Sequence, residues 1–322
     1  MRKNLNPLLN MPKCLLNNSI YTPARENQDL KGQTKDRLKS ESVDLRDRYR
    51  QAGDEKKAKR CEECATFLAY LLRRHLITEE QMRTLESANF CGSKWCPACA
   101  KNKQRKLANE LKSILKQIEA SRPVKYIFLT LTVKNPPLTE LKDTLKAMNK
   151  AFNRLADSPE FKSSVLGYIR ALEALGGNTQ EGEAHPHFHC LLVVKPSYFK
   201  GNKYISQERW SELWRRSLKV DYTPVVDVRR IRQKSAEWSD IDSALCETLK
   251  YLAKPQDIQR LSQADFEELD RQMRNAKQYT RGGLLKEIAP LKDDGFNPEE
   301  WELIGREFYR WLKAEGRYER VE

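Results

Sequence analysis

Three of the four histidines in this chain lie within five residues, as His185, His187 and His189. Side chains two apart on a β-strand share a face, so the three imidazoles are predicted to point one way. Phe188 and alternate residues of the apolar run at 190–194 then point into the core. An imidazole face backed by a hydrophobic face indicates a metal site at the edge of a sheet.

A Mg²⁺ or Mn²⁺ ion on that face requires an oxygen ligand. The preceding predicted strand, GYIRALEAL, offers Glu173. If the hairpin pairs Leu175 with His185, Glu173 lies opposite His187 and on the same face. The turn between the strands offers two alternatives, Glu181 and Glu183.

A second candidate group lies on a predicted helix at 241–254. The stripe expected to be buried consists of Ile241, Leu245, Thr248, Leu249 and Leu252. Glu247, Tyr251 and Lys254 share a face turned away from that stripe. A phenol has a pKa of about 10, so it becomes a nucleophile only when a metal or a lysine helps it lose its proton. A tyrosine that caps the core is the alternative interpretation.

Five of the eight cysteines lie close together, which in a reducing compartment favours a metal over disulfides. By spacing alone, the pairs Cys61/Cys64 and Cys96/Cys99 predict a four-cysteine zinc site. Cys91 is a fifth candidate. The remaining three cysteines are interpreted as ordinary small apolar residues.

The elements that must position these groups indicate an α+β fold. Residues 124–133 alternate as a strand, and further strands are predicted at 164–175, 185–195 and in PVVDVRRIR, with helices between them. Strands joined by a hairpin and interspersed with helices favour an antiparallel central sheet with flanking helices. We also expect a helix in the apolar segment ATFLAYLL and an amphipathic helix at 301–313.

Composition suggests four regions. Residues 1–60 carry an excess of seven positive charges and are expected to be a largely disordered or loosely helical arm that attracts DNA. Residues 61–122 form a cysteine-rich zinc element and a basic helix, 123–290 the main domain, and 291–322 a C-terminal helical segment.

The net charge of +14 favours a polyanionic partner such as nucleic acid. The sequence has no run of about 18 apolar residues, which excludes a membrane-spanning helix. Asn and Pro interrupt the apolar part of the basic N-terminus, so a secretory signal peptide is not expected. We therefore expect a cytoplasmic protein.

Three motifs together resemble plasmid rolling-circle replication initiators, the Rep proteins of the HUH endonuclease superfamily with one catalytic tyrosine. They are FLTLT at 128–132, HPHFHCLLVV at 185–194 and ETLKYLAK at 247–254. Their order and spacing agree with that family. The resemblance runs from about Cys64 to the GGLLK segment at 282–286, and it implies that 123–290 is an HUH nuclease domain.

The resemblance implies a role for each matching residue. His187 and His189 would bind the metal, while the role of His185 stays open. Tyr251 would become joined to the 5′-phosphate of nicked DNA. Glu247 would activate water, Lys254 would position the phosphate as a catalytic residue, and Lys250 and Lys254 would bind DNA. Zinc would be held by Cys64, Cys91, Cys96 and Cys99, with Cys61 as the alternate.

The implied substrate is single-stranded or extruded hairpin origin DNA, and the implied partners are a host helicase and a DNA polymerase that extends the free 3′-OH. Trp210, Trp214 and Tyr222 are candidates for stacking on unpaired bases.

Three other interpretations remain open. A histidine-triad nucleotide hydrolase also fits HPHFHCL, but it needs neither the cysteine cluster nor the tyrosine helix. A zinc-dependent DNA-binding regulator would bind DNA without forming a covalent adduct. A single-tyrosine HUH transposase has the same order of motifs.

Overall fold

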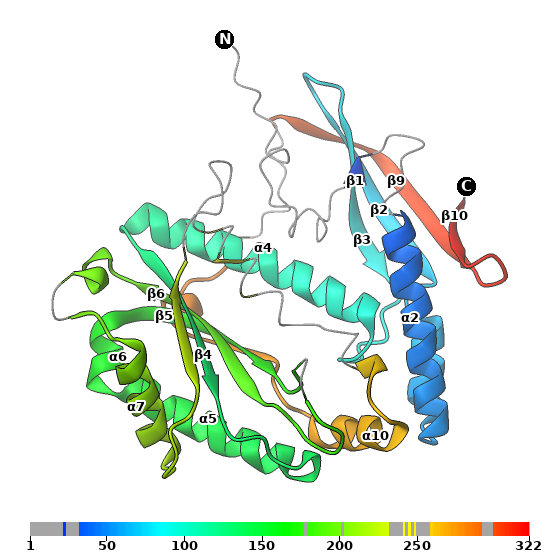
Figure 1. Ribbon diagram of the computed structural model, residues 1–322. Helices are drawn as coiled ribbons and strands as arrows, with labels where there is room; N and C mark the ends of the chain where they lie inside the picture. Colours follow the sequence, from blue (N-terminus) through cyan, green and yellow to red (C-terminus); the bar gives the residue numbers. More distant parts are fainter. Residues whose placement is uncertain are drawn as a thin grey trace. The chain divides into compact units, whose positions relative to one another are not determined.

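The computed structural model describes residues 22–23, 32–176, 179–200, 203–231, 241, 244–245, 248, 258–291 and 299–321 (Figure 1). The chain divides into two compact units. The first, here the histidine unit, is built on residues 108–291. The second, the cysteine unit, combines residues before 108 with the segment after 291.

The histidine unit contains a five-stranded sheet of order β7-β4-β6-β5-β8, in which every neighbouring pair is antiparallel. The strands are β4 Lys125–Thr132, β5 Val165–Glu173, β6 His187–Val194, β7 Val226–Arg230 and β8 Tyr279–Gly283. This arrangement confirms the predicted antiparallel sheet and places the histidine strand β6 at its centre.

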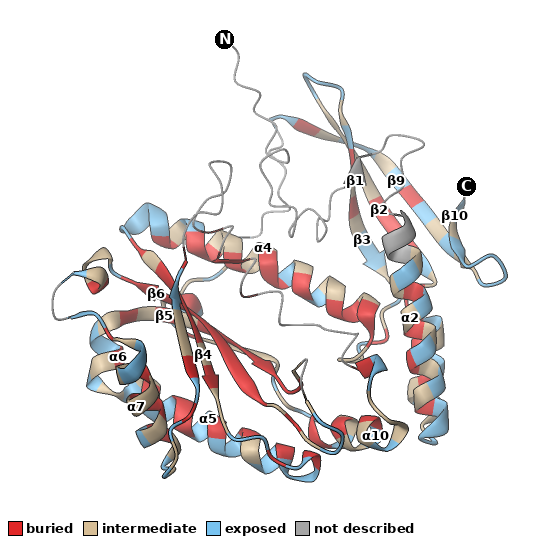
Figure 2. Cartoon of the chain, viewed as in Figure 1, coloured by how far each residue is buried: buried red, intermediate tan, exposed pale blue. Residues whose placement is uncertain are grey.

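Helices cover this sheet, and β6 is buried along its whole length (Figure 2). On one face, Phe188 packs against Phe152 of α5 (Leu141–Asp157) and Trp214 of α7 (Gln207–Leu218). On the other face, Tyr126 of β4 donates a hydrogen bond to Glu119 of α4 (Pro97–Ser121). The shorter or peripheral helices of the unit are η1 Leu138–Glu140, α6 Pro159–Ser164, η2 Pro196–Phe199, α10 Gln263–Gln272 and α11 Leu284–Glu287.

The cysteine unit contains a second antiparallel sheet, of order β1-β3-β2-β9-β10. Its strands are β1 Thr22–Pro23, β2 Phe67–His75, β3 Gln81–Ala88, β9 Trp301–Leu312 and β10 Arg317–Val321. The expected helix in ATFLAYLL and the expected C-terminal helical segment at 291–322 are therefore wrong. Most of the first segment lies in β2, and the described part of the second forms β9 and β10.

The apolar residues of β9 are spaced so that they also fit a helix, which explains the error. Pairing of residues 301–310 with β2 and of residues 308–312 with β10 instead makes the segment a strand. Glu307 lies on the inner face and is 4% exposed, where it receives a hydrogen bond from Tyr309 and an ion pair from Arg83. A buried ionic group of this kind cannot be read from hydrophobic periodicity.

Residues 32–60, expected to belong to a largely disordered or loosely helical arm, are more regular than predicted. They form α2 (Gly32–Gln51) and most of α3 (Glu55–Glu63). Lys39, Ser42, Leu45 and Tyr49 lie on one side of α2 and are buried. Because two of these four are polar and stand in a highly charged run, the stripe carries no clear hydrophobic signal.

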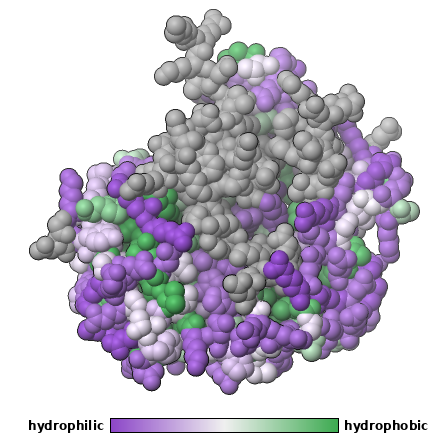
Figure 3. Space-filling model, viewed as in Figure 1, coloured by the Kyte–Doolittle hydropathy of each residue, from purple (hydrophilic) through white to green (hydrophobic). Residues whose placement is uncertain are grey.

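In the part of the chain that is described, no helix is both long and apolar enough to cross a membrane. On the face of the molecule drawn in Figure 3, most of the described surface is hydrophilic, with hydrophobic areas among the hydrophilic residues.

Candidate metal centres

Glu173, His187 and His189 meet on the face of the sheet that α4 covers. Glu173 and His187 are direct partners in the β5–β6 register, as predicted. The Glu173 Oε2 atom lies 2.8 Å from Nε2 of His187 and 2.8 Å from Nε2 of His189. The three side chains are buried, and their ligand atoms lie within 4.8 Å of one another.

The other nitrogen of each imidazole has its own partner. His187 Nδ1 lies 2.7 Å from the His185 carbonyl oxygen, which can only accept a hydrogen bond, so this nitrogen carries the proton. His189 Nδ1 lies 3.3 Å from the Thr130 hydroxyl, and the ring stacks on Phe128. In neutral His187 the Nε2 lone pair consequently faces a carboxylate oxygen. A cation between them relieves that repulsion, so the residues fit a metal.

The side chain of His185 is not part of this group of ligand atoms. Its Nδ1 lies 2.6 Å from Asn135 Oδ1. Burial lowers the pKa of His185, and the neighbouring His187 acts in the same direction. The alternatives Glu181 and Glu183 also lie outside the group, and Glu183 accepts a hydrogen bond from Asn135 instead.

Four buried cysteines form the second group: Cys64, Cys91, Cys96 and Cys99. Cys64 ends α3, Cys91 follows β3, and the last two begin α4. The Sγ–Sγ distances are 3.5 Å for Cys64–Cys96, 3.6 Å for Cys64–Cys99 and 3.5 Å for Cys91–Cys99. A tetrahedral zinc ion with bonds of about 2.3 Å separates its sulfurs by about 3.8 Å, so the spacing fits zinc.

The surroundings of the cysteine group also suit a metal. Backbone N–H groups of Cys91 and Gly92 donate to sulfurs of Cys64 and Cys99. Ser42 Oγ lies 3.3 Å from Cys96 Sγ. Hydrogen bonds with the other thiols, and then burial, raise the pKa of Cys64. Four neighbouring thiolates therefore need a cation to coexist.

Cys61 is buried beside this group but is not one of the four. Its Sγ lies 3.9 Å from that of Cys91. Two residues of α2, Lys39 and Ser42, also lie near the four cysteines. They were not predicted from the sequence, because a lysine and a serine in a highly charged helix give no distinguishing signal.

The residues expected on the tyrosine helix, Glu247, Lys250, Tyr251 and Lys254, lie outside the described residues. The described positions Ile241, Leu245 and Thr248 are helical and buried, which confirms that part of the predicted stripe. Thr248 also donates to the Ala244 carbonyl one turn earlier.

The prediction that Trp210 and Trp214 stack on unpaired bases is wrong. Both are fully buried, and their indole N–H groups donate to the Tyr198 hydroxyl and the Thr132 carbonyl. They belong to the core between α7 and the sheet. Tyr222 is half-buried, and its hydroxyl accepts a hydrogen bond from the Lys134 N–H.

The fold and the two groups define an α+β protein with a candidate Glu-His-His centre and a candidate four-cysteine centre. The family model described as "Replication protein" matches residues 82–317. The chain therefore belongs to the replication protein family. The relatives that it matches are Rep proteins of the plasmid type.

Several relatives carry the name "Protein rep". The one from Streptococcus pneumoniae serotype 2 is 34% identical over 251 residues, which is 77% of this chain and 76% of the relative. The one from Bacillus amyloliquefaciens is 37% identical over 250 residues, 72% of each chain. The one from Lentilactobacillus hilgardii is 34% identical over 240 residues, 72% of this chain and 74% of the relative. No solved structure matches the chain.

Proposed function

We propose that this replication protein is an initiator that nicks one strand of a plasmid origin by tyrosine transesterification. The observation that carries the proposal is the convergence of Glu173, His187 and His189 through one carboxylate oxygen and two imidazole nitrogens. One carboxylate with two imidazoles suits Mn²⁺ and, through its oxygen, Mg²⁺. Membership of the replication protein family also supports a role in the initiation of replication.

A divalent cation held by these residues would polarise the scissile phosphate as a Lewis acid. Tyr251 would attack the phosphorus, forming the phenol–phosphorus bond as the bond to O3′ breaks. The phenol proton leaves to solvent or a basic group, and O3′ takes up a proton as it departs. The products are a 5′-phosphotyrosyl link and a free 3′-OH that a DNA polymerase can extend.

The neighbours of Tyr251 complete this proposal. Lys250 and Lys254 would hold the DNA phosphates, and Glu247 would activate water to end the round. Since a stacked duplex hides its phosphodiester from such a site, the substrate would be single-stranded or an extruded hairpin, opened with the help of a host helicase. Zinc at the four cysteines would be structural.

The geometry also argues against the histidine-triad alternative. A nucleophilic imidazole needs a free ring nitrogen directed at the substrate. In His187 one nitrogen donates to the His185 carbonyl, and the other faces the Glu173 carboxylate, whose negative charge would repel a substrate phosphate there. The family match favours an initiator over a transposase, and a non-catalytic zinc regulator would form no covalent adduct.

The decisive experiment mixes the protein with Mn²⁺ and single-stranded oligonucleotides from its own origin. Mass spectrometry should find the DNA fragment that carries the 5′-phosphate joined to Tyr251, and Tyr251→Phe should form no adduct. Tyr204→Phe is the matched control, because Tyr204 is 54% exposed elsewhere in the same unit. An adduct of undiminished yield in Tyr251→Phe, or none with any divalent metal, contradicts the proposal.

A further inference from the structure

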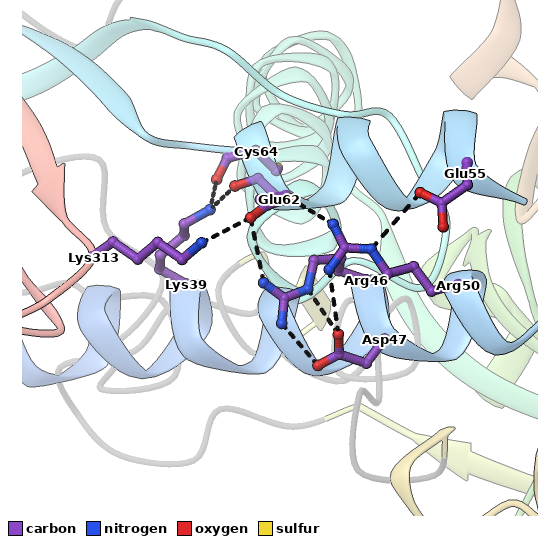
Figure 4. A network of polar contacts seen from close by, with 8 residues as sticks. All are labelled: Lys39, Arg46, Asp47, Arg50, Glu55, Glu62, Cys64 and Lys313. Carbon is purple, nitrogen blue, oxygen red and sulfur yellow. Dashed lines mark hydrogen bonds and ion pairs between the residues drawn. The ribbon is translucent and has the colours of Figure 1, made fainter.

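Lys39 is a lysine buried in the cysteine unit, with 1% of its surface exposed. Its Nζ donates hydrogen bonds of 2.6 Å to the Glu62 carbonyl and 2.7 Å to the Cys64 carbonyl (Figure 4). Both carbonyls lie at the C-terminal end of α3, where a positive charge is favourable. Cys64 is one of the four clustered cysteines, so the ammonium lies against the backbone of the candidate zinc centre.

The two hydrogen bonds of Lys39 leave its charge unneutralised, because both acceptors are uncharged carbonyl oxygens. The Glu62 carboxylate attracts the ammonium electrostatically, but it makes its ion pairs with Lys313, Arg46 and Arg50 (Figure 4). A buried charge that is only partly compensated is costly. The position of Lys39 therefore calls for a nearby source of negative charge.

The four cysteines would supply that charge once a divalent ion is bound. Four thiolates around one Zn²⁺ carry a net charge of −2, which is itself costly in a buried site. Ser42, three residues after Lys39 on the same side of α2, meets the sulfur of Cys96. One helix thus brings both a hydroxyl and an ammonium to the cluster.

We propose that Lys39 is the charge-balancing residue of the zinc centre and that it makes α2 part of that centre. This inference rests on the proposed zinc site. It gives part of the N-terminal 60 residues a specific role, in which α2 stabilises the metal-bound cluster and the bound metal in turn holds α2 against α3.

The test compares Lys39→Met and Lys39→Gln with the unmodified protein, all as full-length chains. Glutamine keeps N–H donors for the carbonyls but removes the charge. Zinc affinity, measured by competition with a chromogenic chelator, should fall roughly 10- to 100-fold in both variants, the range typical of outer partners of a metal site. Lys39→Arg, which keeps the charge, should recover part of the loss.

Lys313→Met is the matched control. Lys313 pairs with the same Glu62, at 3.0 Å from its carboxylate, but its side chain is 76% exposed. This variant should bind zinc as the unmodified protein does. The cobalt-substituted Lys39 variants should retain the absorption bands of four thiolate ligands, which separates a weakened site from a rearranged one.

Thermal unfolding provides a second measurement, which does not require the chelator to remove a tightly bound zinc ion from the protein. Lys39→Met should lower the midpoint with zinc present, and the loss should shrink or reverse in excess chelator, when the ammonium has no anionic cluster to balance. If Lys39→Gln binds zinc as tightly as the unmodified protein, the charge of Lys39 plays no part. Its role would then be limited to hydrogen bonding the Glu62 and Cys64 carbonyls. Absence of zinc from the unmodified protein would overturn the zinc site itself, and this inference with it.

Discussion

Glu173 of β5 and His187 of β6 are direct cross-strand partners, and their Oε2 and Nε2 atoms lie 2.8 Å apart. Facing residues on neighbouring antiparallel strands have side chains on the same side of the sheet. His189 lies two residues further along β6 and therefore points to the same carboxylate oxygen. A single hairpin register thus assembles the three side chains of the candidate nuclease centre.

Replacing Glu173 by Gln should remove the only negative charge among these three side chains. We expect Mn²⁺ affinity to fall by more than about 100-fold, exceeding the effect usual for outer partners, and nicking to fall with it. Isothermal titration and an oligonucleotide cleavage assay measure the two effects. Glu183→Gln is the control, since that carboxylate lies outside the cluster. Equal losses in both variants would argue against Glu173 as the oxygen ligand.

His185 should matter through its backbone more than through its ring. His185→Ala keeps the carbonyl that accepts from His187 Nδ1, so we expect metal-dependent nicking to stay within about tenfold of the unmodified protein. His187→Ala removes a ligand and should abolish nicking. If His185→Ala is as inactive as His187→Ala, the His185 imidazole takes part in the reaction or in metal binding.

The four-cysteine group predicts one zinc ion per chain. Cys96→Ser should lose it and lower the unfolding midpoint, because structural zinc contributes directly to folding. Cys61→Ser should keep the metal, since Cys61 lies beside the group without belonging to it. Elemental analysis of the purified variants distinguishes the two cases. Zinc loss in Cys61→Ser but not in Cys96→Ser would mean that Cys61, and not Cys96, is a ligand.

Gly283 should resist substitution for two separate reasons. Its φ is +54°, and a Cβ there would lie 2.5 Å from the Leu166 carbonyl oxygen on β5. Gly182 has a φ of +73° but open space around it. We expect Gly182→Ala to lose about 1 kcal/mol of unfolding free energy, from backbone strain alone.

Gly283→Ala should lose at least about 3 kcal/mol, because the close contact adds to the strain. Urea denaturation followed by hydrogen exchange at the backbone amides of β5 and β6 reports on the histidine unit, which holds both glycines. Equal destabilisation by the two substitutions would contradict the close packing of β8 and α11 on β5.

The amino-acid sequence was sufficient for features that depend on neighbours in the chain. The alternation of His187, Phe188 and His189 separated the face of the candidate metal centre from the core face, because side chains on a strand alternate whatever the strand pairs with. The short spacings Cys91-x4-Cys96 and Cys96-x2-Cys99, with a family resemblance, likewise pointed to four cysteines that the structure brings together.

Only the tertiary structure decided the features that depend on distant partners. The segment at 301–312 is a strand because β2, more than 200 residues earlier, pairs with residues 301–310 and β10 pairs with the rest. Trp210 and Trp214 lie in the core because α7 packs on the sheet. The sequence of the helix by itself is equally consistent with an exposed surface on which bases stack. Lys39 became a buried partner of the cysteine cluster only when α2 met α3, since burial and charge compensation arise between elements and leave little trace in local pattern.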